Sequence, residues 1–437
     1  MSSILNLRVA TILFLGFSSG LPLALSGGTL QAWLTVEGVR IETIGLFSLV
    51  GLPYTLKFLW SPLLDRFTFP LFGRRRGWII AFQALLLTFI FTMSLMSPAK
   101  VPWILAFLAF GLAFASSSQD IVVDAYRAEL LKEKERGLGA AVSVTGYRIA
   151  MLVSGALALI LSEILGWRLT YMLMAGLMVV GMMAAWLGPE PDDPGTPPRT
   201  LKEAVSEPLV EFFSREKAWL MLALIVLYKL GDAFAGSLST SFLLRGVGFS
   251  VSEVGVINKG MGLGATIVGA LFGGALMARL GLYRSLMLFG ILQAISNLSF
   301  MVLAMVGKNY VLLVFTIAFE NLAGGMGTAA FVAFLMALCN HNFTATQFAL
   351  LSALASLGRV YVGPLSGELV AGLGWLLFFL VTFLAALPGL VLLWKMRDSV
   401  QALERGMSNI YRPYSDDRIY LSSWFCFGAR FSKSQCF

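Results

Sequence analysis

Long apolar runs recur along almost the whole chain and constrain its fold more than any other feature. Each is about 20 residues long, which is the length that an α-helix needs to cross roughly 30 Å of hydrocarbon. Hydrophobic residues make up 58% of the chain and charged residues only 13%, whereas soluble proteins carry about 25% charged residues. We therefore predict an all-α integral membrane protein, and a soluble fold is excluded.

Twelve transmembrane spans are predicted. They cover residues 9–34, 43–62, 78–96, 101–128, 139–162, 169–188, 218–240, 253–277, 284–305, 310–338, 346–371 and 374–395. The first span lacks the charged segment and the small-residue cleavage site of a secretory signal, so we interpret it as a retained helix.

Basic residues indicate the orientation, because Lys and Arg stay in short loops on the cytoplasmic side. With the N-terminus inside, most basic residues outside the spans fall in inner loops and in the C-terminal tail. The outer loops hold only Arg40, Lys100, Arg168, Arg245 and Lys308. The net charge of +8 is explained by this topology without a nucleic-acid partner. Both termini are expected in the cytoplasm.

No cofactor, metal site or disulfide framework is expected. The chain has 3 cysteines and 1 histidine. Cys339 ends a span, Cys426 and Cys436 fall in the final segment, and His341 falls in a predicted inner loop. This spacing fits no CxxC metal site and argues against a His-based metal site or proton relay.

The chain repeats itself at an offset of about 210 residues. GVRIETIGLF (38–47) aligns with GFSVSEVGVI (248–257), which pairs Gly38 with Gly248 and Gly45 with Gly255. Further on, GWRLTY (166–171) aligns with GWLLFF (374–379). The order of the matches indicates that each half of the chain has the same architecture.

A polar segment, proline-rich at its start, divides the chain into two sets of six spans. Two parallel six-helix halves around a central cavity are the architecture of major facilitator transporters, with the substrate site near the membrane midplane. We predict this fold. The expected organisation is an N-terminal half over 1–190, a cytoplasmic linker over 191–217, a C-terminal half over 218–396 and a cytoplasmic, partly disordered tail over 397–437.

The loop between the second and third spans supports this fold. Major facilitator proteins resemble one another in a loop of the form Gly-x-x-x-Asp-Arg-x-Gly-Arg-Arg, in which the Asp contacts a helix end and the arginines anchor the gate. Here SPLLDRFTFPLFGRRRG (61–77) carries an insertion, and the second half has Ala278 where the Asp would be. The alternative is a basic inner loop of no special function. The gating residues expected from the motif are Asp65, Arg66, Arg74, Arg75, Arg76 and Arg279.

Ionisable residues also occur well within the predicted spans. They are Lys57, Asp120, Asp124, Arg148, Lys229, Asp232, Lys259, Glu320 and Arg359. At roughly 2.5 to 3.5 kcal/mol each in lipid, their combined cost would exceed the typical net stability of about 5 to 15 kcal/mol. They must therefore line a water-filled cavity or pair with one another inside the bundle.

Most of these charges fall on spans that line a facilitator cavity. Arg148 and Arg359 are favoured as ligand contacts because a planar guanidinium suits carboxylates. For Lys229 and Asp232, three residues apart, an intrahelical ion pair is an equal alternative. The predicted substrate-binding residues are Gln31, Lys57, Gln119, Tyr147, Arg148, Lys229, Asn258, Lys259, Glu320, Asn321, Arg359 and Tyr361.

The stretch SSSQDIVVDAYRAELL (116–131) places two carboxylates in the fourth span. Asp120 and Asp124 are four residues apart and share one helix face. Two neighbouring carboxylates in a medium of low dielectric raise each other's proton affinity. We therefore predict Asp124, with Asp120, as the proton-coupling site, and Glu320 and Asp232 as further candidates. The alternative is that Asp124 pairs with Arg127 or Lys57 and only fastens helices.

Several long runs resemble the AmpG-type muropeptide permeases. They include GFSSGLPLALSGGTLQAWLTVEG (16–38), SSSQDIVVDAYRAELL (116–131) and TATQFALLSALASLGRVYVGP (344–364) within a similarity over about residues 8–395. The resemblance implies a proton-driven permease of the Gram-negative inner membrane. It would import GlcNAc-1,6-anhydro-MurNAc, with or without its peptide, for cell-wall recycling, and would be linked to β-lactamase induction. Some members continue into two further C-terminal helices, whereas residues 398–437 here contain no apolar run of span length.

Two other kinds of function are compatible with parts of this sequence. A facilitator for another bulky anion such as acetyl-CoA is the alternative within transport, because acetyl-CoA transporters have a similar QD...D helix. A membrane-embedded enzyme or a sensor acting on cell-wall intermediates is the alternative of another class. The short loops and the lack of a usable histidine argue against an enzyme. We expect a monomer whose partners are an anhydromuropeptide, protons and the lipid bilayer.

Overall fold

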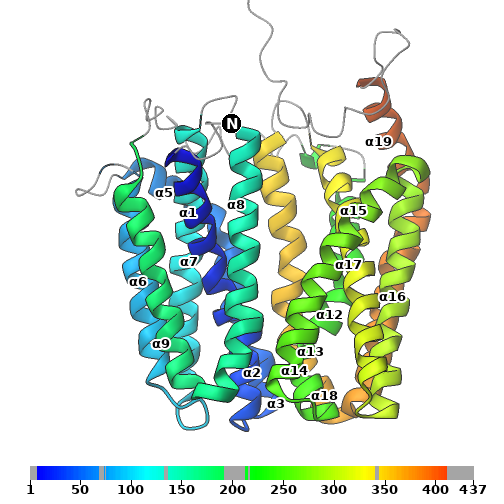
Figure 1. Cartoon of the computed structure of the whole chain (residues 1–437). Helices are drawn as coiled ribbons and strands as arrows, with labels where there is room; N and C mark the ends of the chain where they lie inside the picture. Colours follow the sequence, from blue (N-terminus) through cyan, green and yellow to red (C-terminus); the bar gives the residue numbers. More distant parts are fainter. Residues whose placement is uncertain are drawn as a thin grey trace, which may run out of the picture.

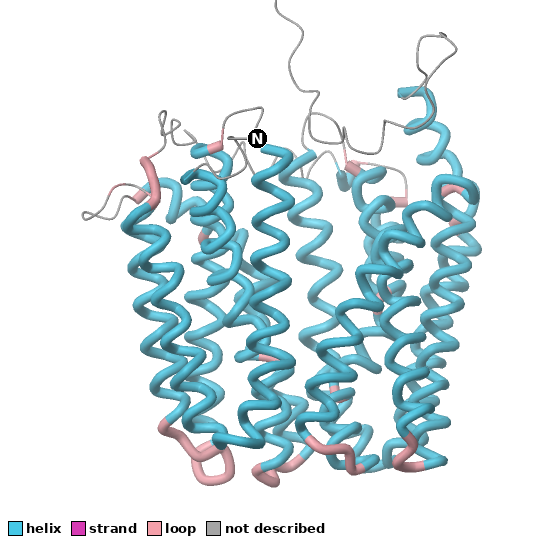
Figure 2. The backbone as a smooth tube through the Cα atoms, in the orientation of Figure 1, coloured by secondary structure: helices cyan, strands magenta, loops and turns pink. Residues whose placement is uncertain are grey.

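The structure is a computed structural model that describes residues 7–67, 73, 75–131, 136–190, 212–214, 217–339 and 344–410. Within these ranges the chain is helical and has no β-strand (Figure 2). Arg74, His341, Cys426, Cys436 and nearly all of the predicted linker lie outside the described residues, as do the side chains of Asp65 and Arg66.

The helices that precede residue 190 form what we call the N-terminal bundle. They are α1 (Leu7–Ser26), α2 (Gly28–Val36), α3 (Ile41–Leu46), η1 (Phe47–Gly51), α4 (Leu52–Leu56), η2 (Lys57–Leu59), α5 (Ser61–Arg66), α6 (Arg76–Ser94), α7 (Pro102–Leu130), α8 (Arg136–Met151), η3 (Leu152–Leu157) and α9 (Ala158–Leu187). Helix α1 packs against α7, α8 and α9, and α6 packs against α7 and α9.

The helices that follow residue 217 form the C-terminal bundle. They are α11 (Ala218–Tyr228), α12 (Leu230–Ser237), α13 (Ser239–Ser241), η4 (Phe242–Val247), α14 (Val251–Glu253), η5 (Val254–Met261), α15 (Gly262–Leu280), α16 (Leu282–Val306), α17 (Tyr310–Leu338), α18 (Thr344–Lys395) and α19 (Arg397–Ile410). Helix α17 packs against α15 and α16, and α18 packs against α11, α12 and α16.

Nine helices of the described chain are long and apolar enough to cross a membrane. Two of them, over Leu138–Leu187 and Leu350–Lys395, are long enough for two crossings each. Each contains a glycine with positive φ, Gly166 or Gly374, where the helix is interrupted. Both interruptions lie within a few residues of a predicted loop.

The predicted span 43–62 differs from the expectation of one continuous helix. It is a series of short helices from α3 to α5. Pro53 and Pro62 each stand in the first turn of a short helix, because proline has no N–H to donate to the preceding turn. With this segmented stretch as one span and the two long helices as two each, the described helices account for the twelve predicted spans.

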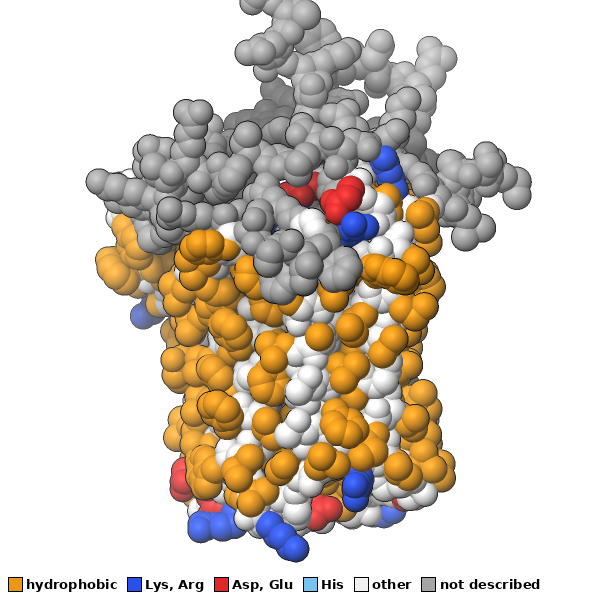
Figure 3. Space-filling view, turned by 90° about the vertical axis from the view of Figure 1, so that its left-hand side faces the viewer, with side chains coloured by type: hydrophobic (Ala, Val, Ile, Leu, Met, Phe, Trp, Pro, Cys, Tyr) orange, Lys and Arg blue, Asp and Glu red, His pale blue; other side chains and the backbone are white. Residues whose placement is uncertain are grey.

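The surface of the bundle is consistent with a lipid environment. On the side that Figure 3 shows, hydrophobic side chains cover the middle of the molecule, and the visible Lys, Arg, Asp and Glu side chains gather toward its two ends. Phe107 and Val311 are exposed to 74% and 82% of their surface. Large exposed apolar side chains are the normal lining of a lipid-facing surface.

The backbone confirms the repeat read from the sequence. Three pairs of positive-φ glycines lie at offsets of about 210 residues. These pairs are Gly38 with Gly248, Gly73 with Gly281, and Gly166 with Gly374. The two bundles therefore turn their chains at equivalent points, as parallel repeats require.

The two bundles meet at the end of the molecule opposite the N-terminus, which we call the far end (Figure 1). Here α18 packs against α3, η1 and α4, η5 packs against η3, and α2 packs against α13 and η4. A side chain at Gly45 would collide with the Gly363 carbonyl, and one at Gly255 would crowd the Ala156 carbonyl. The equivalent glycines Gly45 and Gly255 thus let the bundles approach to backbone contact.

The substitution Gly45→Ala is expected to destabilise the contact between the bundles. The added methyl group has no room, and overpacking of this kind costs about 1 to 3 kcal/mol. We expect a lower unfolding temperature for the purified protein in detergent. Gly176→Ala is the matched control, since a Cβ at Gly176 meets nothing within 4 Å. Equal unfolding temperatures for the two variants would contradict the proposed packing.

Candidate functional site

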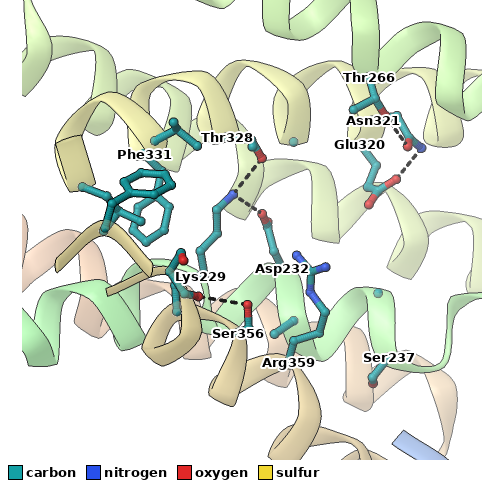
Figure 4. Close-up of a pocket in the computed structure, with 18 residues that line it drawn as sticks. Lys229, Asp232, Ser237, Thr266, Glu320, Asn321, Thr328, Phe331, Ser356 and Arg359 are labelled. Atoms are coloured by element: carbon teal, nitrogen blue, oxygen red, sulfur yellow. Dashed lines mark hydrogen bonds and ion pairs between the residues drawn. The ribbon is translucent and has the colours of Figure 1, made fainter. Parts of the chain in front are cut away.

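A cavity of about 580 Å³ lies in the C-terminal bundle among α12, α15, α17, α18 and the junction between α11 and α12 (Figure 4). Its charged lining residues are Lys229, Asp232, Glu320 and Arg359, and its polar lining includes Ser237, Thr266, Asn321, Thr328, Ser352 and Ser356. The lining extends from Ser237 to Leu335 and Phe348, close to where α17 ends and α18 begins. The cavity therefore extends away from the far end, where the bundles meet.

Lys229 lies at a break in the seventh predicted span, where α11 ends and α12 begins. Its Nζ lies 3.2 Å from Asp232 Oδ2 and donates to Thr328 Oγ1 at 3.4 Å. The ammonium also lies 5.8 Å from the centre of the Phe331 ring. The structure therefore contains the intrahelical ion pair that was an alternative reading of the sequence, and the same lysine lines the cavity.

Asp232 has a second donor that the sequence did not single out. Gln293 on α16 is 4% exposed, and its Nε2 donates to the same Oδ2 that Lys229 contacts. The other amide atom, Oε1, has no hydrogen-bond partner among the described residues. A Cβ at Gly327 would collide with this side chain, so Gly327 makes room for it. An uncharged amide in an apolar span gave no signal that separated it from packing.

Glu320 is held by neutral groups. Asn321 Nδ2 donates to Glu320 Oε2 at 2.6 Å, and Thr266 Oγ1 donates to Asn321 Oδ1 at 2.9 Å (Figure 4). No described cation lies within ion-pair distance of Glu320. Its charged neighbours at longer range are Asp232, Lys229 and Lys259.

Arg359 is the second cation of the cavity. Its side chain projects from α18 among the lining residues (Figure 4). Within the described ranges it forms no ion pair, in contrast to Lys229. An arginine with free donors presents a planar fork that suits a carboxylate or phosphate. The cavity thus combines one paired and one unpaired cation with several hydroxyl and amide groups.

The predicted residues of the N-terminal bundle form a separate polar group. Asp120 lies in electrostatic range of Lys57 and Asp124, and Tyr147 in range of Asp120. Asp124 forms an ion pair with Arg127 at 3.0 Å, and its side chain is 59% exposed. Arg127 is one of the two partners that the alternative for Asp124 names, and this pair lies within α7. Asp120 forms no ion pair with any described residue.

Other predicted contacts of this group lie beside buried polar atoms. Gln119 is fully buried and donates from Nε2 to Ser19 Oγ at 3.3 Å, while its Oε1 has no partner in the described chain. Arg148 is partly buried on α8 and forms no described ion pair. These side chains do not line the cavity of the C-terminal bundle.

Three predicted contacts lie where the bundles meet. Gln31 Nε2 donates to the Ser237 carbonyl at 2.5 Å, and Lys259 Nζ donates to Thr240 Oγ1 at 3.0 Å. Asn258, beside Lys259 in the π-helical segment η5, has a buried Nδ2 with no described partner. Tyr361 is 57% exposed and does not line the cavity.

Two of the predicted gating arginines, Arg75 and Arg76, are anchored within the N-terminal bundle. Arg75 is 6% exposed and binds Glu129 with Nε and Nη2, the latter at 2.7 Å. Arg76 Nε donates to Glu190 at 2.8 Å and its Nη1 to the Gly188 carbonyl at 2.6 Å. Arg279, at the end of α15, is exposed. The basic loop therefore fixes the ends of α7 and α9 to the start of α6.

The geometry suits the binding of a polar small molecule. The volume lies within the roughly 300 to 1,000 Å³ that is usual for small-molecule sites. Its charged and hydroxyl groups come from helices on several sides, so they can surround a polar ligand. Among the described residues no group of three or more His, Cys, Asp or Glu could hold a metal ion.

Comparisons with known proteins agree with this reading. The family model described as Major Facilitator Superfamily matches residues 12–242. An anhydromuropeptide permease of Escherichia coli strain K12 is 57% identical over 396 residues, which cover 90% of this chain and 80% of that protein. An uncharacterized protein of Haemophilus influenzae is 39% identical over 90% of this chain and 95% of its own length.

A solved transporter of the POT family shares the fold at 12% identity. Its TM-score is 0.69, and the match covers 90% of this chain and 96% of that one. This chain and the solved transporter therefore share one fold. The chain belongs to the major facilitator superfamily and, within it, to the family of the anhydromuropeptide permeases.

Proposed function

We propose that this chain is a proton-coupled importer of anhydromuropeptides across the bacterial inner membrane, for use in cell-wall recycling. The observation that carries the proposal is the 57% identity with the Escherichia coli permease over 90% of this chain. The site supports it, since an anhydromuropeptide combines carboxylates with many hydroxyl and amide groups. The cavity offers cations for the former and Ser, Thr and Asn side chains for the latter.

Within this function, Arg359 is the proposed anchor for a substrate carboxylate. It lines the cavity and has no described ion-pair partner, so it can bind without first breaking a contact. Lys229 is engaged by Asp232 and Thr328. A ligand carboxylate that approached Lys229 would compete with Asp232 for the ammonium group. Binding there would leave the Asp232 carboxylate without its cation.

Asp120 and Glu320 are the proposed proton carriers. Of the four carboxylates considered from the sequence, Asp124 and Asp232 are in ion pairs with Arg127 and Lys229. A carboxylate beside a cation keeps its charge, whereas one without a cation changes protonation at less cost. We therefore favour Asp120 and Glu320 over Asp124 and Asp232 as proton carriers.

We propose that residues 1–190 and 218–396 act as two moving units joined by a cytoplasmic linker. Both termini lie in the cytoplasm, and the transporter is a monomer. The basic residues of the predicted inner loops support this orientation. The α2, α3 and α14 end would then face the periplasm, and the cavity would extend toward the cytoplasm. This arrangement corresponds to an inward-facing state.

The direct test is uptake of labelled anhydromuropeptide into right-side-out vesicles with an imposed pH gradient. We expect accumulation that collapses when a protonophore removes the gradient. Competition with acetyl-CoA separates the proposed substrate from another bulky anion. Uptake that is absent, or that acetyl-CoA suppresses more strongly than unlabelled anhydromuropeptide does, would contradict the proposal.

Arg359→Gln is expected to weaken substrate binding. Loss of a charge-assisted hydrogen bond costs about 1.5 to 3 kcal/mol, so we expect KM for uptake to rise about 10- to 100-fold. Arg359→Lys should retain part of the affinity, since it keeps the charge and loses the fork. The exposed Arg168, replaced by Ala, is the control. An unchanged KM in Arg359→Gln would exclude this residue as the anchor.

Asp120→Asn and Glu320→Gln test the proton carriers. In the variant that removes the carrier, we expect gradient-driven accumulation to be lost while exchange of labelled for unlabelled substrate continues. Exchange survives because it needs no net proton movement. The exposed Glu368, replaced by Gln, is the control. If both variants accumulate substrate like the parent, neither residue carries the proton.

A further inference from the structure

A row of hydrogen bonds, which we call the ladder, joins α2 to the segment from α12 to η4. Its members are Gln31 with Ser237, Thr35 with Ser241, and Arg245 with the Thr35 and Val39 carbonyls. Gln31 Nε2 donates to the Ser237 carbonyl at 2.5 Å. Thr35 and Ser241 share a hydrogen bond of 2.8 Å between their hydroxyl groups. Since Ser237 also lines the cavity, the ladder starts at the cavity and runs to the far end of the molecule.

Arg245 in η4 forms the last step of this ladder. Its Nε and Nη2 donate to the Thr35 carbonyl at 2.9 and 2.5 Å, and its Nη1 donates to the Val39 carbonyl at 2.7 Å. Helix α2 ends at Val36, so the Thr35 carbonyl belongs to its last turn. Carbonyls of a last helical turn carry the negative end of the helix dipole. The Thr35 carbonyl also accepts from the Gly38 N–H at 3.2 Å, and its second lone pair is available to the guanidinium. Arg245 therefore caps a helix of the other bundle.

The repeat explains why the cap lies at this point. Thr35 and Arg245 are 210 residues apart and are thus equivalent positions of the two halves. Equivalent positions meet only near the axis that relates the two bundles. The pair is unequal, because one side offers a guanidinium and the other a main-chain carbonyl. One side chain can therefore hold both bundles together at the axis.

All the acceptors of the Arg245 bonds belong to the N-terminal bundle, whereas Arg245 belongs to the C-terminal bundle. The bonds exist only while the far ends of the bundles are together. A transporter that exposes its site to alternate sides must separate these ends in one of its states. An interaction made in only one of two states shifts the equilibrium toward that state by its own free energy.

We propose that Arg245 is the latch of the far-end gate: by capping α2 it holds the cavity closed toward the far end, and it must release α2 before the cavity opens there. The proposal rests on alternating access, which belongs to the proposed function. It does not depend on which substrate is carried.

The test measures access to the cavity from the far side. A single cysteine is placed at Gly236 in a chain whose 3 native cysteines are replaced. Gly236 lines the cavity, and a Cβ there meets nothing within 4 Å. A membrane-impermeant maleimide is added to right-side-out and inside-out vesicles, and the labelling rate of the cysteine is recorded in each.

Arg245→Ala is expected to raise the labelling rate from the far side about tenfold and to lower it from the other side, because the loss of charge-assisted bonds favours the open gate. Arg245→Lys should give a smaller rise, about threefold, since one ammonium cannot reproduce the fork. Arg168→Ala, which removes an exposed arginine near the same end, should change neither rate.

A permeant maleimide provides the folding control, since it should label every properly inserted variant to the same extent. Unchanged far-side labelling in Arg245→Ala, or in Arg245→Lys if the alanine variant does not insert, would overturn the latch. Because labelling needs no substrate, a labelling shift without anhydromuropeptide uptake would reject the proposed substrate and leave the latch standing.

Discussion

The cost of placing ionised groups in hydrocarbon governs this molecule. A charged side chain in the middle of an apolar span is tolerated only when water, a counter-charge or several hydrogen bonds replace its hydration. The structure meets this requirement in three ways. Lys229 pairs with Asp232, Glu320 accepts a hydrogen bond from the neighbouring Asn321 amide, and Arg359 faces a cavity. The polar interior of the protein exists because these groups have no acceptable place on its lipid-facing surface.

The same cost shapes the contact between the bundles. Without a hydrophobic driving force in lipid, helices associate through close backbone approach and hydrogen bonds. Gly45 and Gly255 provide the first at equivalent points of the two halves, and the ladder from Gln31 to Arg245 provides the second. A contact built from a few small residues and polar bonds can separate and reform, as alternating access requires, more readily than an interlocked apolar core.

The sequence predicted the fold well because its signals are large. Apolar runs set the spans, and the glycine pairs at a fixed offset set the repeat, since only glycine readily adopts the positive φ of these turns. The second span is predicted, but its division into short helices is not, because the apolar composition of the stretch gives a stronger signal than its two prolines. The charged residues of the cavity could also be predicted from a large signal. A charged residue within an apolar run must face water or a partner, so it stands out in the sequence.

Residues without such a signal could not be predicted. Gln293 acts through a contact 61 residues from its partner Asp232, and nothing in the local sequence separates it from packing. The sequence places Arg245 only as an outer-loop cation. Its acceptors are main-chain carbonyls, which have no sequence signature, so its contact with α2 could not be predicted. The sequence names Asp124 together with Asp120 and cannot separate them, because only three-dimensional geometry shows that Asp124 faces Arg127.

We propose that the cations of the cavity select an anionic sugar peptide. The most direct measurement is calorimetric titration of the purified protein with an anhydromuropeptide and with the same compound whose carboxylates are converted to amides. We expect binding of the acid and a loss of at least tenfold in affinity for the amide, since a charge-assisted hydrogen bond is worth about 1.5 to 3 kcal/mol. Equal affinity for the two compounds would contradict it.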